Sequence, residues 1–236
     1  DARVRVEHVD LQPFNYSRIN NMGARLAGGQ YLLFLNNDTC VLHPEWMREM
    51  VQWASLPQIG AVGARLLHAD GSIQHAGVIV GLTGFAGHVF AGLPADAHGI
   101  FGPVQAYRNT LAVTAACMML RREVFEQAGG FNEEFILCGN DVELGLRLNR
   151  LGYRVMVNPF ATLEHLESVT HQGNIPAQDF FTSYIHYHQV LQAGDPYFSP
   201  NLSYWQSAPD WRQPGEPAPL RFAQQHLESL KQRGLI

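Results

Sequence analysis

The stretch YLLFLNNDTCV, residues 31–41, joins a run of apolar side chains to a cluster of two amides and a carboxylate. Its first five residues are continuously apolar, which is typical of a strand covered on both faces of a sheet. Asn36, Asn37 and Asp38 follow at once. Ligands of open α/β sheets bind beyond the carboxyl ends of the parallel strands, so these side chains stand where a metal or a phosphate would bind. An Asx turn or a helix cap explains the same residues equally well.

The single carboxylate in this cluster limits the cation site that it can form. Mg²⁺ prefers oxygen ligands and usually binds one or two carboxylates together with substrate phosphates. Asp38 and its flanking amides therefore predict a cation shared with a diphosphate, and a poor metal site without one.

The segments before this stretch predict a βαβ unit. Residues 3–10 alternate and are rich in valine, as in a strand. Asn15 or Ser17 can cap the helix that follows, and the glycines at 28–29 end it. A strand, a helix and a second strand at this spacing favour a parallel pair of strands.

The rest of the chain continues the alternation of strands and helices. An Asp-Gly turn after the strand at 59–67 predicts a hairpin. Residues 81–110 are rich in glycine and predict a long functional loop. We expect Pro159 to close a later strand, with a polar loop after it. Other strands are predicted at 112–120 and 153–159, and helices at 44–55, 121–130, 141–151, 178–192 and 221–233.

The composition limits the classes to which this protein can belong. The 236 residues carry a net charge of -5 with no basic footprint, so we expect no nucleic-acid partner. The longest apolar run, at 111–120, is too short for a transmembrane segment, which needs about 20 residues. Cys40, Cys117 and Cys138 are odd in number and widely spaced, as in the reduced thiols of a cytosolic protein.

Histidine is abundant, with 11 residues. His68, His75, His88 and His98 are scattered among glycines and lack the short paired spacing of a zinc site. Roles as loop residues or as polar groups facing a substrate are expected for them.

Two further side chains are candidates for chemistry. Asp141 begins an amphipathic helix, whose dipole stabilises a carboxylate by roughly 0.3–1 kcal/mol. It is either a helix cap, as Asn140 also can be, or a general base that takes a proton from a hydroxyl. His165 follows a strand and is a plausible ligand of the same cation if it converges with Asp38.

Five segments, in order, resemble glycosyltransferase family 2, which has the GT-A fold. The resemblance is closest to its rhamnosyltransferase-like and O-antigen biosynthesis branch. The segments are PFNYSRINNMGARLAGGQYLLFLNNDT, IGAVGARLLHADGSIQHAGVIVG, AVTAACMMLRREVFEQAGGFNEEF, NDVELGLRLNRLGYRV and LEHLES.

The resemblance implies an α/β GT-A (Rossmann-like) fold with a mixed, mostly parallel sheet flanked by helices. Residues 1–175 would form the catalytic domain and residues 176–236 a helical, aromatic-rich extension packed on it. The family's first nucleotide-binding strands have no match in residues 1–20. We therefore expect an N-terminally truncated domain that binds nucleotide poorly, can be inactive by itself and leaves a sheet edge exposed.

The implied activity is inverting transfer of a hexosyl or rhamnosyl group. The donor would be a UDP- or dTDP-linked sugar and the acceptor a glycan or lipid-linked saccharide. The family's setting implies polysaccharide biosynthesis in the cytoplasm or at the cytoplasmic face of the inner membrane.

The resemblance also assigns roles to single residues. The segment Asn36-Asn37-Asp38 stands at the family's D-x-D motif, with asparagine in place of the first aspartate. Asp38 and His165 would bind Mg²⁺ or Mn²⁺ against the donor diphosphate, and Asp141 would be the general base. The expected acceptor contacts are Asn140, Glu167 and Ser168.

One alternative is a non-catalytic module of the same fold that binds a glycan or a nucleotide. The aromatic residues near the C-terminus would then stack on sugars, although a hydrophobic strap over the sheet explains them as well. They are Tyr197, Phe198, Tyr204, Trp205 and Trp211. A nucleotidyltransferase is a further alternative, because the same arrangement of strands and helices would suit that class of enzyme. Proximity of Asp38 to His165, with Asp141 across a cleft, would favour the glycosyltransferase.

Overall fold

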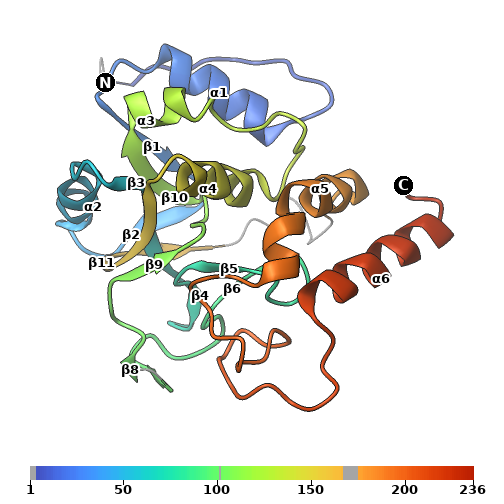
Figure 1. Cartoon of the computed structure of the whole chain (residues 1–236). Helices are drawn as coiled ribbons and strands as arrows, with labels where there is room; N and C mark the ends of the chain where they lie inside the picture. The colour runs from blue at the N-terminus through green and yellow to red at the C-terminus, as the bar shows by residue number, and fades with distance from the viewer. Residues whose placement is uncertain (1–3, 101, 167–174) are drawn as a thin grey trace.

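A mixed β-sheet forms the centre of the protein, with helices on both faces (Figure 1). The computed structural model describes residues 4–100, 102–166 and 175–236. The main path of the sheet has the strand order β1-β10-β3-β11-β2. Its strands are β1 (Tyr31–Leu35), β2 (Thr39–Val41), β3 (Ile59–Leu67), β10 (Cys117–Arg121) and β11 (Arg154–His165), and β4 (Ile73–His75) and β9 (Arg108–Thr110) pair with β3 and β11.

The two faces of the sheet bury separate apolar clusters. On one face, α1 (Tyr16–Leu26), α3 (Arg122–Gln127) and α4 (Asn140–Arg150) pack over Leu32, Phe34 and Leu120. On the other face, α2 (Trp46–Ala54) packs Met50 against Leu33 and Leu163. The alternation along β1 follows from this, because successive strand residues point to opposite faces.

The sheet is mixed, as expected, but the expectation of a mostly parallel sheet is wrong for the described strands. Only β3 and β11 pair in parallel, with Val155 opposite Ala61 and Leu163 opposite Leu66. The pairs β1–β10, β10–β3, β11–β2, β11–β9 and β3–β4 are antiparallel. The central strand β10 runs antiparallel to both of its neighbours, and the short strands β2, β4 and β9 add the other antiparallel pairs.

The predicted N-terminal strand does not form. Residues 4–10 have no strand conformation, and Val4 and Val6 are 68% and 70% exposed. The βαβ unit proposed for residues 3–35 is therefore incorrect, although its helix forms as α1 with Asn15 as the N-cap. Among the described strands, β1 lies at the edge of the main sheet and pairs with β10 alone.

The last strand of the sheet is longer than predicted. We expected Pro159 to end a strand and a polar loop to follow, but β11 continues through Pro159 to His165. Its pairing with β3 shifts register between Asn158 and Thr162, so the proline lies at an irregularity. Asn158 Oδ1 accepts a hydrogen bond from Phe160 N at 2.9 Å there.

The predicted hairpin is confirmed by the antiparallel pairing of β3 and β4, with Leu66 opposite His75. The predicted long loop at 81–110 also contains short strands. Its β6 (Ala86–His88) pairs with β5 (Val78–Val80), which directly precedes the loop, and its β7 (His98–Gly99) pairs with β8 (Gly102–Pro103).

The C-terminal segment packs on the rest of the chain through a shared core. Its helices are α5 (Ala177–Ala193) and α6 (Pro219–Gln232). Tyr187 and Leu227 from these helices belong to one buried cluster with Val78 and Val142. Asp195 Oδ2 accepts a hydrogen bond from Val80 N at 2.8 Å, which ties the segment after α5 to β5.

The C-terminal aromatic residues divide into two groups. Phe198 and Tyr204 are buried and pack edge to face, which fits the strap interpretation. Tyr197, Trp205 and Trp211 are exposed, Trp211 by 61%.

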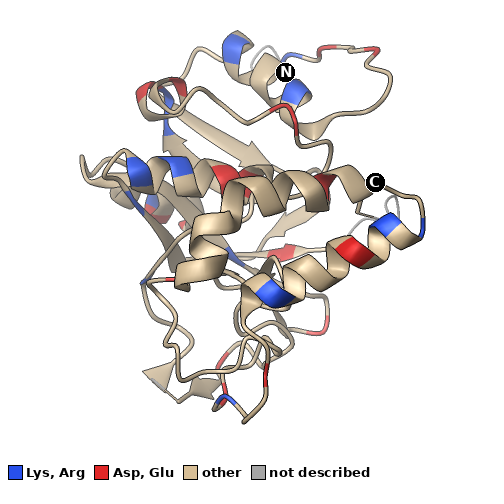
Figure 2. Ribbon diagram, turned by 45° about the vertical axis from the view of Figure 1, so that its right-hand side comes forward, with Lys and Arg blue, Asp and Glu red and all other residues tan. Residues whose placement is uncertain are grey.

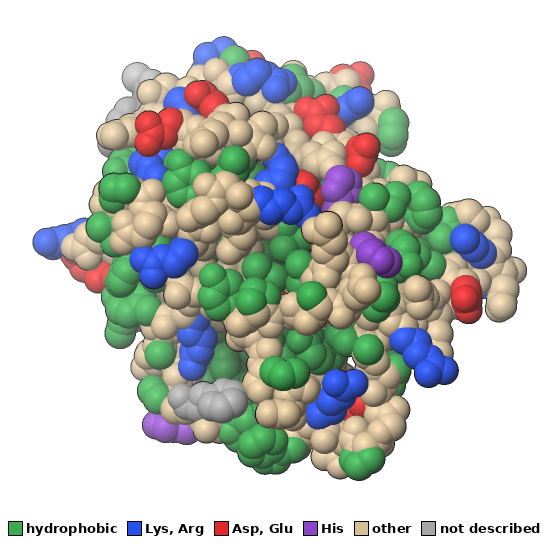
Figure 3. Space-filling view, viewed as in Figure 1, with side chains coloured by type: hydrophobic (Ala, Val, Ile, Leu, Met, Phe, Trp, Pro, Cys, Tyr) green, Lys and Arg blue, Asp and Glu red, His purple; other side chains and the backbone are tan. Residues whose placement is uncertain are grey.

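The surface carries no extended block of one charge on the face shown in Figure 3, where acidic and basic side chains alternate with apolar ones. Along α4, acidic residues lie in the first turn and basic residues in the last, as Figure 2 shows. This arrangement complements the helix dipole. Within the described residues, no helix is both long and apolar enough to cross a membrane.

Candidate active site at the ends of β1 and β11

The ends of β1 and β11 bring Asp38 and His165 together. Antiparallel pairing of β2 with β11 sets His165 opposite Thr39, and Leu166 N donates to Asp38 O at 2.9 Å. As a result, His165 Nε2 lies 3.1 Å from Asp38 Oδ1. Both side chains are largely buried, with 12% and 17% of their surfaces exposed.

The amide of Asn36 joins the same pair. Asn36 Nδ2 lies 3.3 Å from His165 Nε2, whereas Asn37 is exposed. Thr39 Oγ1 donates to Asn36 O at 2.8 Å, which closes a turn directly after β1. The opening stretch thus forms the polar turn that its sequence suggested, and it also brings Asn36 and Asp38 to His165.

The donor set suits a divalent cation that is shared with a ligand. It offers one carboxylate, one imidazole nitrogen and the neighbouring amide of Asn36. In the part of the chain that the structure describes, no group of three or more His, Cys, Asp or Glu side chains could hold a metal. Mg²⁺ commonly completes its coordination with substrate phosphates and water, so two strong protein ligands are enough for such a site.

Asp141 lies in the first turn of α4, where the chain enters the helix through Gly139 with φ of +93°. Asp141 Oδ1 accepts from Val142 N at 2.8 Å, and Oδ2 accepts from Ala115 N at 3.1 Å. Burial raises the pKa of Asp141, and the hydrogen bond from Ala115 and the nearby His88 act in the opposite direction. A raised pKa favours a general base, because it lies closer to the working pH.

Three consecutive residues connect Asp141 to the end of β1. Ala115 N donates to Asp141, and the next residue, Ala116, accepts a hydrogen bond from Asn36 N at 2.9 Å. The residue before them, Thr114, donates its N–H to His75 Nε2 at 3.4 Å. We expected a strand over residues 112–120, but it begins only at Cys117. The apolar segment before it instead holds the polar groups of the site.

A buried pair of histidines is part of this arrangement, and its place was not predicted. His75 Nδ1 and His88 Nδ1 lie 3.0 Å apart, and the pairing of β5 with β6 helps to bring them together. His75 is fully buried, and burial together with the neighbouring His88 and His165 lowers its pKa well below the ordinary value. The sequence shows four histidines among glycines in this region, but their spacing does not indicate which of them come into contact.

The C-terminal segment holds the loop that leads to Asp141, which the sequence also did not reveal. Asp179 of α5 is buried and accepts hydrogen bonds from three consecutive backbone N–H groups, those of residues 136–138, at 2.7–2.9 Å. Tyr187 OH donates to Gly139 O at 2.6 Å.

Of the three expected acceptor residues, the structure describes only Asn140. Asn140 is 3% exposed, and its amide donates to Ser17 Oγ at 3.1 Å and accepts from Asp141 N at 2.8 Å. These bonds anchor α4 to α1, and its contact with an acceptor stays a prediction. Glu167 and Ser168 lie outside the described residues.

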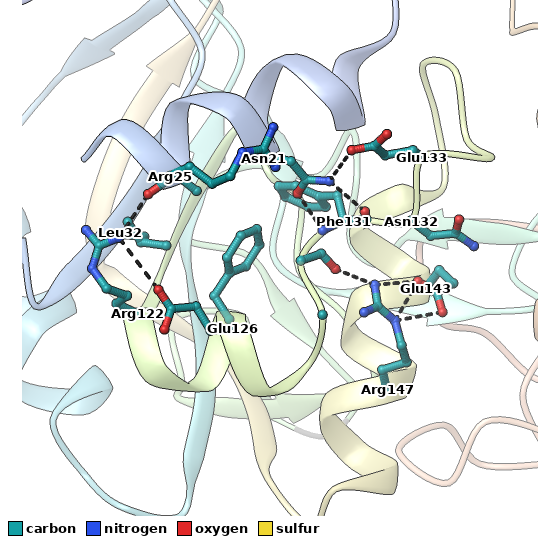
Figure 4. Close-up of a pocket in the computed structure, with 14 residues that line it drawn as sticks. Asn21, Arg25, Leu32, Arg122, Glu126, Phe131, Asn132, Glu133, Glu143 and Arg147 are labelled. Atoms are coloured by element: carbon teal, nitrogen blue, oxygen red, sulfur yellow. Dashed lines mark hydrogen bonds and ion pairs between the residues drawn. The ribbon is translucent and has the colours of Figure 1, made fainter. Parts of the chain in front are cut away.

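A cavity of about 680 Å³ lies elsewhere, between α1, α3 and α4 (Figure 4). Several of its polar groups bind one another: Arg147 Nε donates to both Glu143 oxygens at 2.8 Å, and Asn21 Nδ2 donates to Glu133 Oε1 at 3.0 Å. None of the predicted site residues lines it. The cavity therefore belongs to the packing of the three helices.

Comparison with known families agrees with the fold. The sequence profile described as Glycosyl transferase family group 2 matches residues 31–182, which include β1, the Asp38 turn, α4 and His165. The chain belongs to this family.

Two curated relatives cover most of the chain. The O-antigen biosynthesis protein RfbC of Myxococcus xanthus is 51% identical over 194 residues, 81% of this chain and 15% of that protein. The uncharacterized protein y4gI of Sinorhizobium fredii (strain NBRC 101917 / NGR234) is 38% identical over 86% of this chain and 23% of that protein. The chain thus spans less than a quarter of the length of these two relatives.

Two solved structures share the fold at low sequence identity. Mannosyltransferase PcManGT from Pyrobaculum calidifontis, in complex with GDP-Man and Mn²⁺, aligns with 98% of this chain and 53% of its own, at a TM-score of 0.50 and 15% identity. GalNAc-T7 with UDP, GalNAc and Mn²⁺ aligns with 69% of this chain and 32% of its own, at a TM-score of 0.50 and 16% identity. The GT-A glycosyltransferase fold expected from the sequence is confirmed.

Proposed function

We propose that this chain carries the catalytic site of a metal-dependent, inverting glycosyltransferase that uses a nucleotide-sugar donor. The observation that carries the proposal is the 3.1 Å approach of His165 Nε2 to Asp38 Oδ1, together with the backbone link from Asn36 through residues 115–116 to Asp141. The residues of the proposed cation site and the buried carboxylate of Asp141 are thus linked through one chain of hydrogen bonds.

The roles follow from the chemistry of an inverting displacement. Asp38 and His165 would hold the cation, and Asn36 and Asn37 would lie beside the donor diphosphate. When bound, the Mg²⁺ or Mn²⁺ ion neutralises charge on the leaving diphosphate. Both structural neighbours were solved with Mn²⁺, which supports this choice of metal.

Asp141 would accept the proton of the acceptor hydroxyl as that oxygen attacks the anomeric carbon. The bond from this carbon to the diphosphate oxygen breaks in the same displacement, so the configuration inverts. The backbone N–H groups of Ala115 and Val142 orient the carboxylate. Its raised pKa makes it a better proton acceptor than an ordinary aspartate.

The donor is proposed to be a UDP- or dTDP-linked hexose or rhamnose and the acceptor a glycan or lipid-linked saccharide. The name of the Myxococcus xanthus relative supports O-antigen or a related polysaccharide as the product. A relative from Mycobacterium tuberculosis (strain ATCC 25618 / H37Rv), 26% identical over 46% of this chain, is named N-acetylglucosaminyl-diphospho-decaprenol L-rhamnosyltransferase. That name supports a rhamnosyl donor and a lipid-linked acceptor.

In this proposal residues 1–175 form the catalytic domain and residues 176–236 an extension that braces it, which the bonds of Asp179 and Tyr187 support. The three unpaired cysteines support a reducing, cytoplasmic location, with membrane association through the acceptor.

A donor screen tests the proposed activity. The protein at its natural length is incubated with Mn²⁺, a panel of UDP-, dTDP- and GDP-linked sugars and candidate acceptors, and release of nucleoside diphosphate is followed. We expect release with one donor class, and an inverted anomeric centre in the product by NMR. Donor binding without turnover by any donor would favour the alternative, a non-catalytic binding module.

A further inference from the structure

Gln74 holds His165 by both its ring and its backbone. Gln74 Oε1 lies 2.6 Å from His165 Nδ1, and Gln74 Nε2 donates to His165 O at 3.2 Å. The two residues are 91 positions apart in the chain and meet because β4 and β11 both pair with β3.

The two contacts together determine where the imidazole proton lies. A backbone carbonyl can only accept, so the amide nitrogen of Gln74 must face His165 O. The amide oxygen must then face His165 Nδ1. Because that oxygen can also only accept, Nδ1 must carry a proton. In the neutral ring, Nε2 therefore keeps its electron pair, and Asn36 Nδ2 at 3.3 Å can donate to it. Asp38 Oδ1 lies 3.1 Å from the same atom, so two acceptors stand side by side, an arrangement that a shared cation would neutralise.

We propose that Gln74 is a positioning residue that selects the Nδ1–H tautomer of His165 and so makes Nε2 the metal ligand. The inference rests on the proposed function, in which Asp38 and His165 hold the cation. Histidine ligands of metals commonly donate their other ring N–H to an acceptor, which fixes the tautomer and the ring orientation. The amide of Gln74 supplies that acceptor here.

The surroundings of Gln74 keep its amide in place. It is 8% exposed and lies between Ile73 and His75, which are both fully buried. Antiparallel pairing of His75 with Leu66 fixes the strand that carries it. Its Nε2 also lies 3.5 Å from His68 Nδ1.

The tautomer can be measured without any metal or donor. Protein with ¹⁵N-labelled histidine is studied by long-range ¹H–¹⁵N NMR about two units above the ordinary histidine pKa of about 6.5, where a typical ring is neutral. The His165→Gln variant assigns the signals. We expect His165 as the Nδ1–H form in the wild type, a shift toward the Nε2–H form in Gln74→Met, and retention of Nδ1–H in Gln74→Glu, which keeps an acceptor. An Nε2–H ring or a doubly protonated ring in the wild type, or no change in Gln74→Met, would overturn the proposal.

Metal binding gives the second readout. Mn²⁺ is titrated in the presence of inorganic pyrophosphate, and free Mn²⁺ is followed by electron paramagnetic resonance. Loss of an outer-shell partner typically weakens metal binding about 10–100-fold, so Gln74→Met should show that loss and Gln74→Glu should not. Wild-type affinity in Gln74→Met would contradict the proposal. A wild-type protein that binds no Mn²⁺ would instead contradict the metal site of the proposed function, while the NMR result would still decide the tautomer.

Discussion

Ala115 N donates a hydrogen bond to Asp141 Oδ2 at 3.1 Å, and this bond joins the start of α4 to the segment that leads into β10. The neighbouring Ala116 accepts from Asn36, which follows β1. The position of the proposed base is thus tied by backbone bonds to the strand end that carries the proposed cation site. Substitutions in the segment before β10 should therefore affect both the proposed base and the proposed cation site.

The pH dependence of transfer should reflect the raised pKa of Asp141. The base is active when it is deprotonated, so kcat/KM should fall as pH decreases through this pKa. Because burial raises the pKa, the acid limb should lie at a higher pH than the value of about 3.9 for an ordinary aspartate. The profile is measured with saturating Mn²⁺ and a donor in excess. An acid limb at the ordinary aspartate value would contradict the assignment of the base.

Removal of the cation should stop transfer. EDTA should abolish nucleoside diphosphate release, and added Mn²⁺ or Mg²⁺ should restore it. Asp38→Ala and His165→Ala should each lose Mn²⁺ affinity in an EPR titration, because each removes one of two strong protein ligands. A transfer rate that is unchanged by EDTA would contradict a role for the metal.

The contact of α4 with the segment before β10 should not tolerate an added methyl group. A Cβ at Gly145 would come within 2.9 Å of the Ala112 backbone and would also meet Leu111 O. Gly145→Ala should lower the free energy of unfolding by about 1–3 kcal/mol, the usual cost of overpacking.

Gly23→Ala is the matched control, because it is also a helical glycine and its Cβ would meet nothing within 4 Å. It should raise the unfolding free energy by about 0.5–1 kcal/mol, since alanine is the better helix former. Urea denaturation measures both. Equal effects of the two substitutions would show that the α4 contact is looser than described.

Asp195 should make stability depend on pH in a definite direction. Burial raises its pKa from 3.8 to about 6, so the folded state binds this proton more tightly than the unfolded state. The stabilisation that this proton provides is complete at pH values below the pKa of Asp195 in the unfolded state. It is lost as pH rises through the pKa of Asp195 in the folded state. A shift of about two units corresponds to about 3 kcal/mol.

Subtracting the unfolding free energy of the Asp195→Asn variant from that of the wild type gives a difference that isolates this effect. It should fall by that amount as pH rises from about 3 to 7, because the variant lacks the titrating carboxyl. A difference that does not change with pH would show that the segment after α5 is not packed tightly against Val80.

Local patterns were sufficient to predict most of the helices and the central strands. Asn15 caps α1 as its position suggested, and the Asp-Gly turn forms the β3–β4 hairpin. Residues 4–10 alternate like a strand, but no strand in the described part of the chain pairs with them to bury their valines. Pro159 is accommodated inside β11 because an irregular register needs no hydrogen bond from its nitrogen.

The sequence was sufficient to propose site residues whose type allows only a few chemical roles. It was not sufficient to find residues whose contacts depend on how distant segments fold together. The approach of Asp38 to His165 could be expected once both were placed at strand ends. Gln74, the His75–His88 pair and Asp179 could not, because their partners lie 13 to 91 residues away and no spacing rule connects them.

The most direct test of the account is the Asp141→Asn substitution in the protein at its natural length. The variant keeps the shape of the side chain but is a much weaker proton acceptor, so kcat should fall by about 10²–10⁴-fold. The Kd of the donor with Mn²⁺, measured by calorimetry, should stay at the wild-type value, and Glu228→Gln on the exposed surface of α6 serves as the control. Normal turnover in Asp141→Asn would contradict the central claim that this carboxylate is the base.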